Sequence, residues 1–140
     1  MAERLIRLFW PAPRKKERLP EEIARNRARF QAAGELAGEI RKTDFPYPIT
    51  RIVLFGGVAR NKDRADSDID LAIVFGNLGY RIPIEIEKKL DFLAREMAQE
   101  KFGEFRTLPF HLTVLTETMY QMYKETSAVI KAIHQDGIEL

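Results

Sequence analysis

The segment spanning residues 54–71 reads LFGGVARNKDRADSDIDL. It begins inside a short run of β-branched and aromatic residues, 49–55, which predicts a strand covered on both faces. Two glycines end that strand, and a polar segment leads from them to an alternating run at 68–75 that predicts a second strand. The stretch therefore places a glycine turn between two strands.

Two carboxylates, Asp68 and Asp70, stand at the start of the second expected strand. Residues two apart in a strand project to the same face, with backbones about 7 Å apart. Neighbouring carboxylates repel one another unless a cation or proton intervenes, and hard oxygen ligands favour Mg²⁺ or Mn²⁺. Taken alone, such an acidic pair is more often solvated on an open sheet face.

Gly56 and Gly57 come directly after the first strand. They permit a tight turn with φ above zero, and they let backbone N–H groups approach a ligand without a Cβ in the way. Such a turn can hold a triphosphate, although two glycines by themselves also describe a routine loop. The combination of strand, glycine turn, polar linker and acid-bearing strand indicates a metal and triphosphate site far more specifically than the glycines or the acidic pair alone.

Hydrophobic periodicity outside this stretch predicts further helices and a third strand. The expected order is helix 20–42, strand 49–55, strand 68–75, helix 83–101, strand 108–116 and helix 117–134. We expect the last helix to point four side chains toward the core: Tyr120, Tyr123, Ile130 and Ile133. This order predicts an α+β fold, with helices packed on one small mixed sheet.

The composition is that of one globular domain. The chain has 140 residues, of which 45% are hydrophobic and 31% charged. No apolar run approaches the roughly 20 residues that a membrane span needs, and the N-terminus lacks a secretory signal, so we expect a cytoplasmic protein without a membrane segment. Because the chain has no cysteine, any metal must bind to oxygen or imidazole.

Residues 1–19 look like an arm ahead of a domain spanning 20–140. Residues 1–29 hold nine basic and four acidic side chains, so this part could meet RNA, DNA or an acidic protein, or could simply be solvated. Large apolar residues in the arm suggest docking on its own domain or on another subunit. A homodimer is expected from Phe9 and Trp10.

Residues 54–71 resemble the signature of minimal nucleotidyltransferases of the DNA polymerase β superfamily, in which a Gly-Ser or Gly-Gly turn precedes an Asp-x-Asp strand. Residues 133–138 resemble the same small proteins more loosely. The resemblance implies a polymerase β palm-like fold and transfer of a nucleoside monophosphate, with AMP from ATP as the expected case, to a protein or RNA hydroxyl. Gly56 and Gly57 would then contact the nucleotide phosphates, and Asp68 and Asp70 would hold Mg²⁺ or Mn²⁺.

Arg60 and Ser67 match family positions near the phosphates. Either residue could equally cap a turn or lie on the surface. They are therefore nucleotide-binding candidates on the resemblance alone.

The family usually supplies a third carboxylate from the strand after the middle helix, but residues 108–116 contain no acid. His111 and Thr113 share one face of this strand, and Glu104 and Glu117 flank it. His111 is the candidate for the third position, although a strand histidine is more often structural.

The resemblance leaves two classes of function open. Small stand-alone members are often paired with a helical HEPN protein in toxin–antitoxin modules, so an active transferase acting as an antitoxin is the leading hypothesis. The alternative is a catalytically degenerate binding module that acts through partner capture or oligomerisation. Modification of a small molecule is less favoured, because 140 residues leave little chain for a separate substrate domain.

Overall fold

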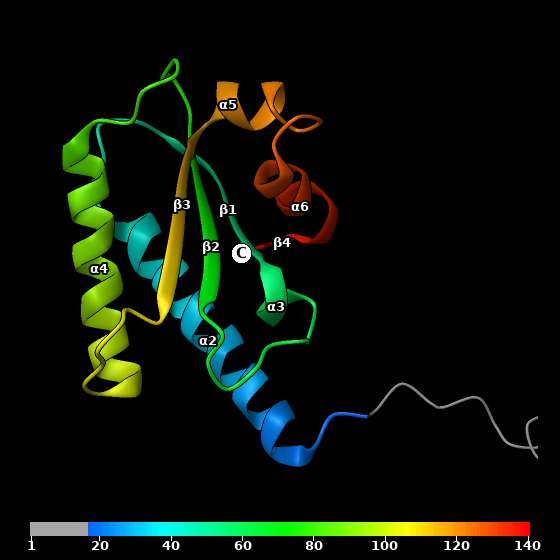
Figure 1. Ribbon diagram of the computed structural model, residues 1–140. Helices are drawn as coiled ribbons and strands as arrows, with labels where there is room; N and C mark the ends of the chain where they lie inside the picture. Colours follow the sequence, from blue (N-terminus) through cyan, green and yellow to red (C-terminus); the bar gives the residue numbers. More distant parts are fainter. Residues whose placement is uncertain (1–16) are drawn as a thin grey trace, which may run out of the picture.

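The computed structural model describes residues 17–140, and Figure 1 shows their arrangement. The five elements expected between residues 20 and 116 are all present, with ends shifted by two residues or fewer. In chain order the elements are α2 (Pro20–Lys42), β1 (Ile49–Phe55), α3 (Gly56–Ala59), β2 (Ile69–Phe75), α4 (Ile84–Phe102), β3 (Phe110–Thr116), α5 (Glu117–Met122), α6 (Ala128–Asp136) and β4 (Ile138–Glu139).

The strands of residues 17–140 form one mixed sheet in the order β3-β2-β1-β4. β1 runs antiparallel to β2 and to β4, whereas β2 and β3 are parallel. A parallel pair needs a long crossover, and α4 supplies it. The expected α+β fold with a small mixed sheet is confirmed.

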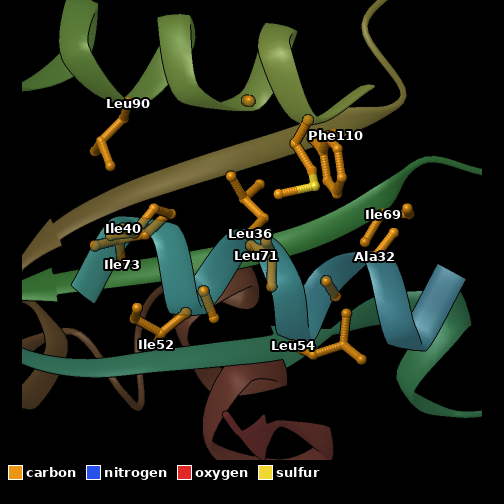
Figure 2. Packing of buried hydrophobic residues seen from close by; sticks show 14 of the residues in the cluster. Ala32, Leu36, Ile40, Ile52, Leu54, Ile69, Leu71, Ile73, Leu90 and Phe110 are labelled. Carbon is orange, nitrogen blue, oxygen red and sulfur yellow. The ribbon is translucent and has the colours of Figure 1, made fainter. Parts of the chain in front are cut away.

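One face of the sheet is covered by α2 and α4 (Figure 1). Alternate residues of β2, among them Ile69, Leu71 and Ile73, point into this layer, as their spacing predicts. Figure 2 shows them packed against Leu36 of α2 and Phe110 of β3. The first turns of α2 extend beyond this layer, because its buried residues begin only at Ala32.

The opposite face is covered by α5 and α6 (Figure 1). Ala72 and Val74 of β2 pack there with Tyr120 of α5 and Ile133 of α6. Since Asp70 shares the parity of Ala72, it projects to this same face. β2 therefore has an apolar side packed on α2 and α4, and a side that begins with a carboxylate and continues under α5 and α6.

The expected single helix over 117–134 is wrong, because the chain forms two helices there. The side chain of Thr116 accepts a hydrogen bond from Met119 N at the start of α5, and that of Ser127 accepts one from Ile130 N at the start of α6. Each hydroxyl caps a separate helix. The break leaves Tyr123 39% exposed rather than in the core.

Two short elements were not expected from the sequence. α3 is a single turn built on the glycines, and β4 pairs Ile138 and Glu139 with β1. Gly137 allows this pairing, since a Cβ there would collide with the Ile133 carbonyl and the Val53 side chain. Within residues 17–140, no helix has both the length and the apolarity that crossing a bilayer requires.

Candidate functional site

The glycine turn, Asp70 and His111 meet at one end of the sheet. In the register of the strands, Asp70 lies between Phe55 on β1 and His111 on β3. β1 ends where β2 and β3 begin, because β1 is antiparallel to β2 while β3 is parallel to it. The end of β1, where Gly56 follows, is thereby brought next to a carboxylate and an imidazole.

Gly56 is fixed at this point by conformation and by space. Its φ is +75°, and a Cβ would collide with the Asp70 carboxylate. An L-residue rarely adopts that conformation. The expectation of a positive φ is therefore confirmed at Gly56, but Gly57 is not among the residues with positive φ. Gly57 instead continues into α3, where its carbonyl accepts a hydrogen bond from Lys62 N at 2.8 Å.

Asp70 is partly buried, with 25% of its side chain exposed, and Asp68 is exposed just ahead of β2. Burial raises the pKa of the Asp70 carboxyl above its ordinary value of 3.8; the imidazole of His111 opposes this shift, and the charge of Asp68 adds to it. The two carboxylates are thus close enough to repel one another. A divalent cation would relieve this repulsion, so the pair fits the metal that we expect.

His111 is the only candidate for the third position that the structure joins to Asp70. Its Nδ1 lies 3.1 Å from Asp70 Oδ1. Thr113 is opposite Ala72 instead, and Glu104 is exposed in the loop before β3. Glu117 accepts a hydrogen bond from Thr50 Oγ1 at the far end of β3, about 20 Å along the strand from His111.

The site as described contains two carboxylates and an imidazole, but they do not form a complete metal cage. Within residues 17–140, no group of three or more His, Asp or Glu side chains is gathered closely enough to hold a metal ion. Further ligands would have to come from elsewhere, as is usual for Mg²⁺, which keeps waters and takes oxygens from substrate phosphates.

Comparison with known proteins assigns this arrangement to a family. The family model of a nucleotidyltransferase domain matches residues 37–138, which contain every element from the C-terminal turn of α2 to the start of β4. The chain belongs to the nucleotidyltransferase domain family. A solved structure from Sulfolobus solfataricus, described provisionally as a nucleotidyltransferase, is 19% identical and superposes with a TM-score of 0.51 over 91% of this chain and 90% of that chain. No curated protein sequence matches the chain.

The two further nucleotide-binding candidates of this nucleotidyltransferase lie on the loop between α3 and β2. Ser67 Oγ accepts a hydrogen bond from Arg64 N at 2.7 Å, so it caps the turn in the structure. Arg60 is exposed, and its Nε lies 3.4 Å from the Gly56 carbonyl. Arg60 therefore stands beside the glycine turn, whereas the Ser67 hydroxyl is already engaged within the loop.

Asp63 is a residue of the nucleotidyltransferase that the sequence analysis missed. Its side chain is fully buried and receives hydrogen bonds from Arg29 at 2.7 Å, Asn26 at 2.8 Å and Arg18 at 3.0 Å, all donated from α2 or the residues just before it. Burial opposes ionisation, but the hydrogen bonds from Asn26 and Arg29 and the charge of Arg18 keep the pKa of Asp63 below its ordinary value of 3.8. A buried charge of this kind is retained only when it is paired.

These donors, together with Arg25, also bind the backbone of the loop. Arg29 also donates to the carbonyls of Arg64 and Ala65, Arg25 donates to the carbonyl of Asp63, and Asn26 donates to that of Val58. The loop that links the glycine turn to Asp68 is thus fastened to one helix. A signal for it was present, since Arg25 and Arg29 lie one helical turn apart, but nothing in the sequence named Asp63 as their partner.

Proposed function

We propose that this nucleotidyltransferase transfers a nucleoside monophosphate from a nucleoside triphosphate, ATP in the expected case, to an acceptor hydroxyl. The observation that carries the proposal is the packing of the Asp70 carboxylate against Gly56 and beside His111. Nothing larger than a hydrogen fits on Gly56, so the turn and the carboxylate are shaped together. Membership of the family supplies the reaction class.

The position of each residue gives it a separate role in the proposed reaction. Asp68 and Asp70 would hold Mg²⁺ or Mn²⁺, and the backbone at Gly56 and Gly57 would contact the phosphates, with Arg60 as a nearby cation. A divalent ion, when bound, supplies positive charge to the phosphates and lowers the pKa of an attacking hydroxyl. The protein contributes placement, because Asp70 sits on a strand that is paired on both sides.

We propose His111 for the position that the third carboxylate usually takes. Its Nδ1 contact restricts the orientation of the Asp70 carboxylate, and 64% of its side chain stays exposed to an incoming acceptor. We assign it a positioning role, since it is the group that touches Asp70 from the neighbouring strand.

The test is transfer of label from α-³²P-ATP to total cellular RNA and protein in the presence of Mg²⁺ or Mn²⁺. Asp70→Asn is expected to lower transfer at least 100-fold, because losing one electrostatic contributor to a transition state typically costs about 10² to 10³ in rate. Asp66→Asn is the matched control, since Asp66 is an exposed carboxylate on the same loop. Equal transfer by wild type and Asp70→Asn would exclude this site.

The degenerate binding module remains a second candidate because β3 carries no acid. It predicts that wild-type protein binds nucleotide or partner without any transfer of label. Label transfer separates the cases, because only the transferase requires it. Calorimetry with ATP, with and without Mg²⁺, then measures whether Asp70 contributes metal-dependent affinity, which Asp70→Asn should weaken. Label transfer that Asp70→Asn abolishes would rule the binding-only module out.

The resemblance also extends the proposal to partners and location. We propose a HEPN-type protein as partner, a cytoplasmic location and self-association through the arm, whose Phe9 and Trp10 lie outside the described residues. Light scattering of the chain alone and after co-expression with the product of an adjacent gene would measure both kinds of assembly. A mass of 16.2 kDa in both samples would contradict them.

A further inference from the structure

A cationic depression lies beside the candidate site. It is about 550 Å³ in volume and is formed by the loop after α3 and the N-terminal end of α2. Its lining includes five cationic side chains: Arg18, Arg25, Arg60, Lys62 and Arg64. Only two carboxylates line it, so the depression has an excess of positive charge in a chain whose net charge is +2.

The two carboxylates are already engaged with the cations of α2 and the residues just before it. Asp63 is enclosed by Arg18, Arg25 and Arg29, and Glu22 lies 3.5 Å from Arg18. Neither is available to neutralise the loop. One buried carboxylate shared by three guanidinium groups itself leaves positive charge uncompensated.

The cations of the loop add to this excess of positive charge. Arg60, Lys62 and Arg64 are exposed and recur at alternate positions, and none of them forms an ion pair with any residue between 17 and 140. Like charges held on one short segment repel one another, and a multiply charged anion would relieve this repulsion.

The lining identifies the chemistry of that anion. Guanidinium and ammonium groups donate hydrogen bonds and match phosphate oxygens. None of the residues that line the depression is aromatic, so it offers no surface on which bases could stack. Recognition would thus involve phosphates and would be largely independent of base sequence.

The depression adjoins the glycine turn. Arg60, whose Nε lies 3.4 Å from the Gly56 carbonyl, and Arg18, just before α2, both line it. Its lining therefore combines a cation beside the place proposed for the triphosphate with further cations of the loop and of α2. A ligand with phosphates at regular intervals fits this layout better than a single nucleotide.

We propose that this depression binds the phosphodiester backbone of a polynucleotide acceptor, whose end is thereby directed toward Gly56 and Asp70. The proposal rests on the transferase function for its purpose, but the binding itself does not require catalysis. It assigns Lys62 and Arg64 to acceptor binding and makes a polynucleotide the acceptor class.

The experiment measures fluorescence anisotropy of a labelled 12-nucleotide oligouridylate at salt concentrations from 50 to 200 mM. Lys62→Ala/Arg64→Ala is expected to weaken binding at least tenfold at 50 mM salt. It should also reduce the slope of log K against log salt by about 1.4, because each phosphate contact contributes about 0.7 for a single strand. Lys124→Ala/Lys131→Ala is the matched control, since both lysines are exposed near α5 and α6, and it should bind as wild type does.

Further measurements distinguish binding of a polynucleotide from binding of a nucleoside triphosphate, and distinguish failure of acceptor binding from failure of the transferase function. RNA affinity that survives saturating Mg-ATP, and that Asp70→Asn leaves unchanged, supports a separate acceptor surface even if transfer fails. Displacement of the RNA by Mg-ATP would overturn the proposal, because the depression would then be the triphosphate site. Equal affinity for polyaspartate would also overturn it in favour of an acidic protein, as would unaltered RNA binding by Lys62→Ala/Arg64→Ala.

Discussion

At the scale of single residues, the site depends on the contact between Gly56 and Asp70. The glycine has a left-handed φ of +75°, and the carboxylate occupies the space where a Cβ would be. Both facts act in the same direction, since a side chain at residue 56 would be strained and would also displace Asp70. The glycine therefore serves the backbone and the site together.

Replacing Gly56→Ala is expected to lower the free energy of unfolding by about 1–2 kcal/mol, the cost of a left-handed L-residue, and to abolish label transfer. Gly34→Ala is the control, because a Cβ at that position of α2 meets nothing within 4 Å. It should raise stability by about 0.5–1 kcal/mol through helix propensity. Urea denaturation measures both, and wild-type stability with full activity in Gly56→Ala would refute this role.

The sequence predicted the positions of Gly56 and Asp70 but not the contact between Asp70 and His111. Period-2 alternation placed Asp70 on the face of β2 opposite to Ile69, Leu71 and Ile73, and the conformational freedom of glycine predicted the turn. The contact with His111 depends on the register between β2 and β3, two strands that α4 separates in the chain. Spacing within one strand carries no information about such a register.

At the scale of elements, the loop from Arg60 to Asp68 is held to α2 by one buried carboxylate. Asp63 accepts from three residues of α2 and its approach, and the same arginines bind the carbonyls of the loop. The polar segment that the sequence presents as a linker is thus a fixed part of the site. This long-range pairing could not be predicted, because arginines and aspartates are common in any charged chain.

Asp63→Asn is expected to destabilise the fold by about 3–5 kcal/mol, because removing the charge of this buried carboxylate leaves three part-buried guanidinium groups without their shared partner. Loosening the loop should also reduce label transfer in the protein that remains folded. Asp66→Asn removes the same charge three residues later at an exposed position and should change stability by less than about 0.5 kcal/mol. Comparable thermal unfolding of both variants would contradict the assigned role of Asp63.

Longer elements were predictable and short ones were not. The patterns of α2, α4, β1, β2 and β3 extend over seven residues or more, and their ends were found within two residues. α3 and β4 contain four and two residues, too few for a periodic pattern. The break between α5 and α6 depends on Ser127 as a cap, a signal that the apolar spacing on either side of it obscured.

At the scale of the whole molecule, paired carboxylates determine how stability changes with acid. The pKa of Asp63 lies below its ordinary value of 3.8, because donors from α2 outweigh burial. The pKa of Glu117 lies below 4.5, since hydrogen bonds from Gln121 and Thr50 and the charge of Arg51 also outweigh burial. Groups with lowered pKa values stabilise the fold when ionised, and this contribution disappears as the pH falls through the folded pKa.

The free energy of unfolding should therefore stay nearly level from pH 7 to about pH 5 and decline below the ordinary carboxyl values. Asp70 has the opposite sign, since its pKa is raised, so its protonation favours the fold as the pH falls. Comparing wild type with Asp63→Asn isolates one group, because the stability difference should shrink below pH 3.8. A difference that grows with acid would mean that Asp63 is not an ionised partner.

The double pairing of Asp70 has a consequence for how this scaffold can vary. Its backbone is tied to Phe55 on one side and to His111 on the other, so its Cα is a fixed reference point. A different substrate must therefore be accommodated relative to Asp70. The segments that can adapt are those whose length can change without altering the hydrogen bonds between the strands. The connection at 103–109 is such a segment, whereas the loop at 60–68 is held to α2 through Asp63. A new acceptor preference should therefore be engineered at 103–109 rather than in the strands.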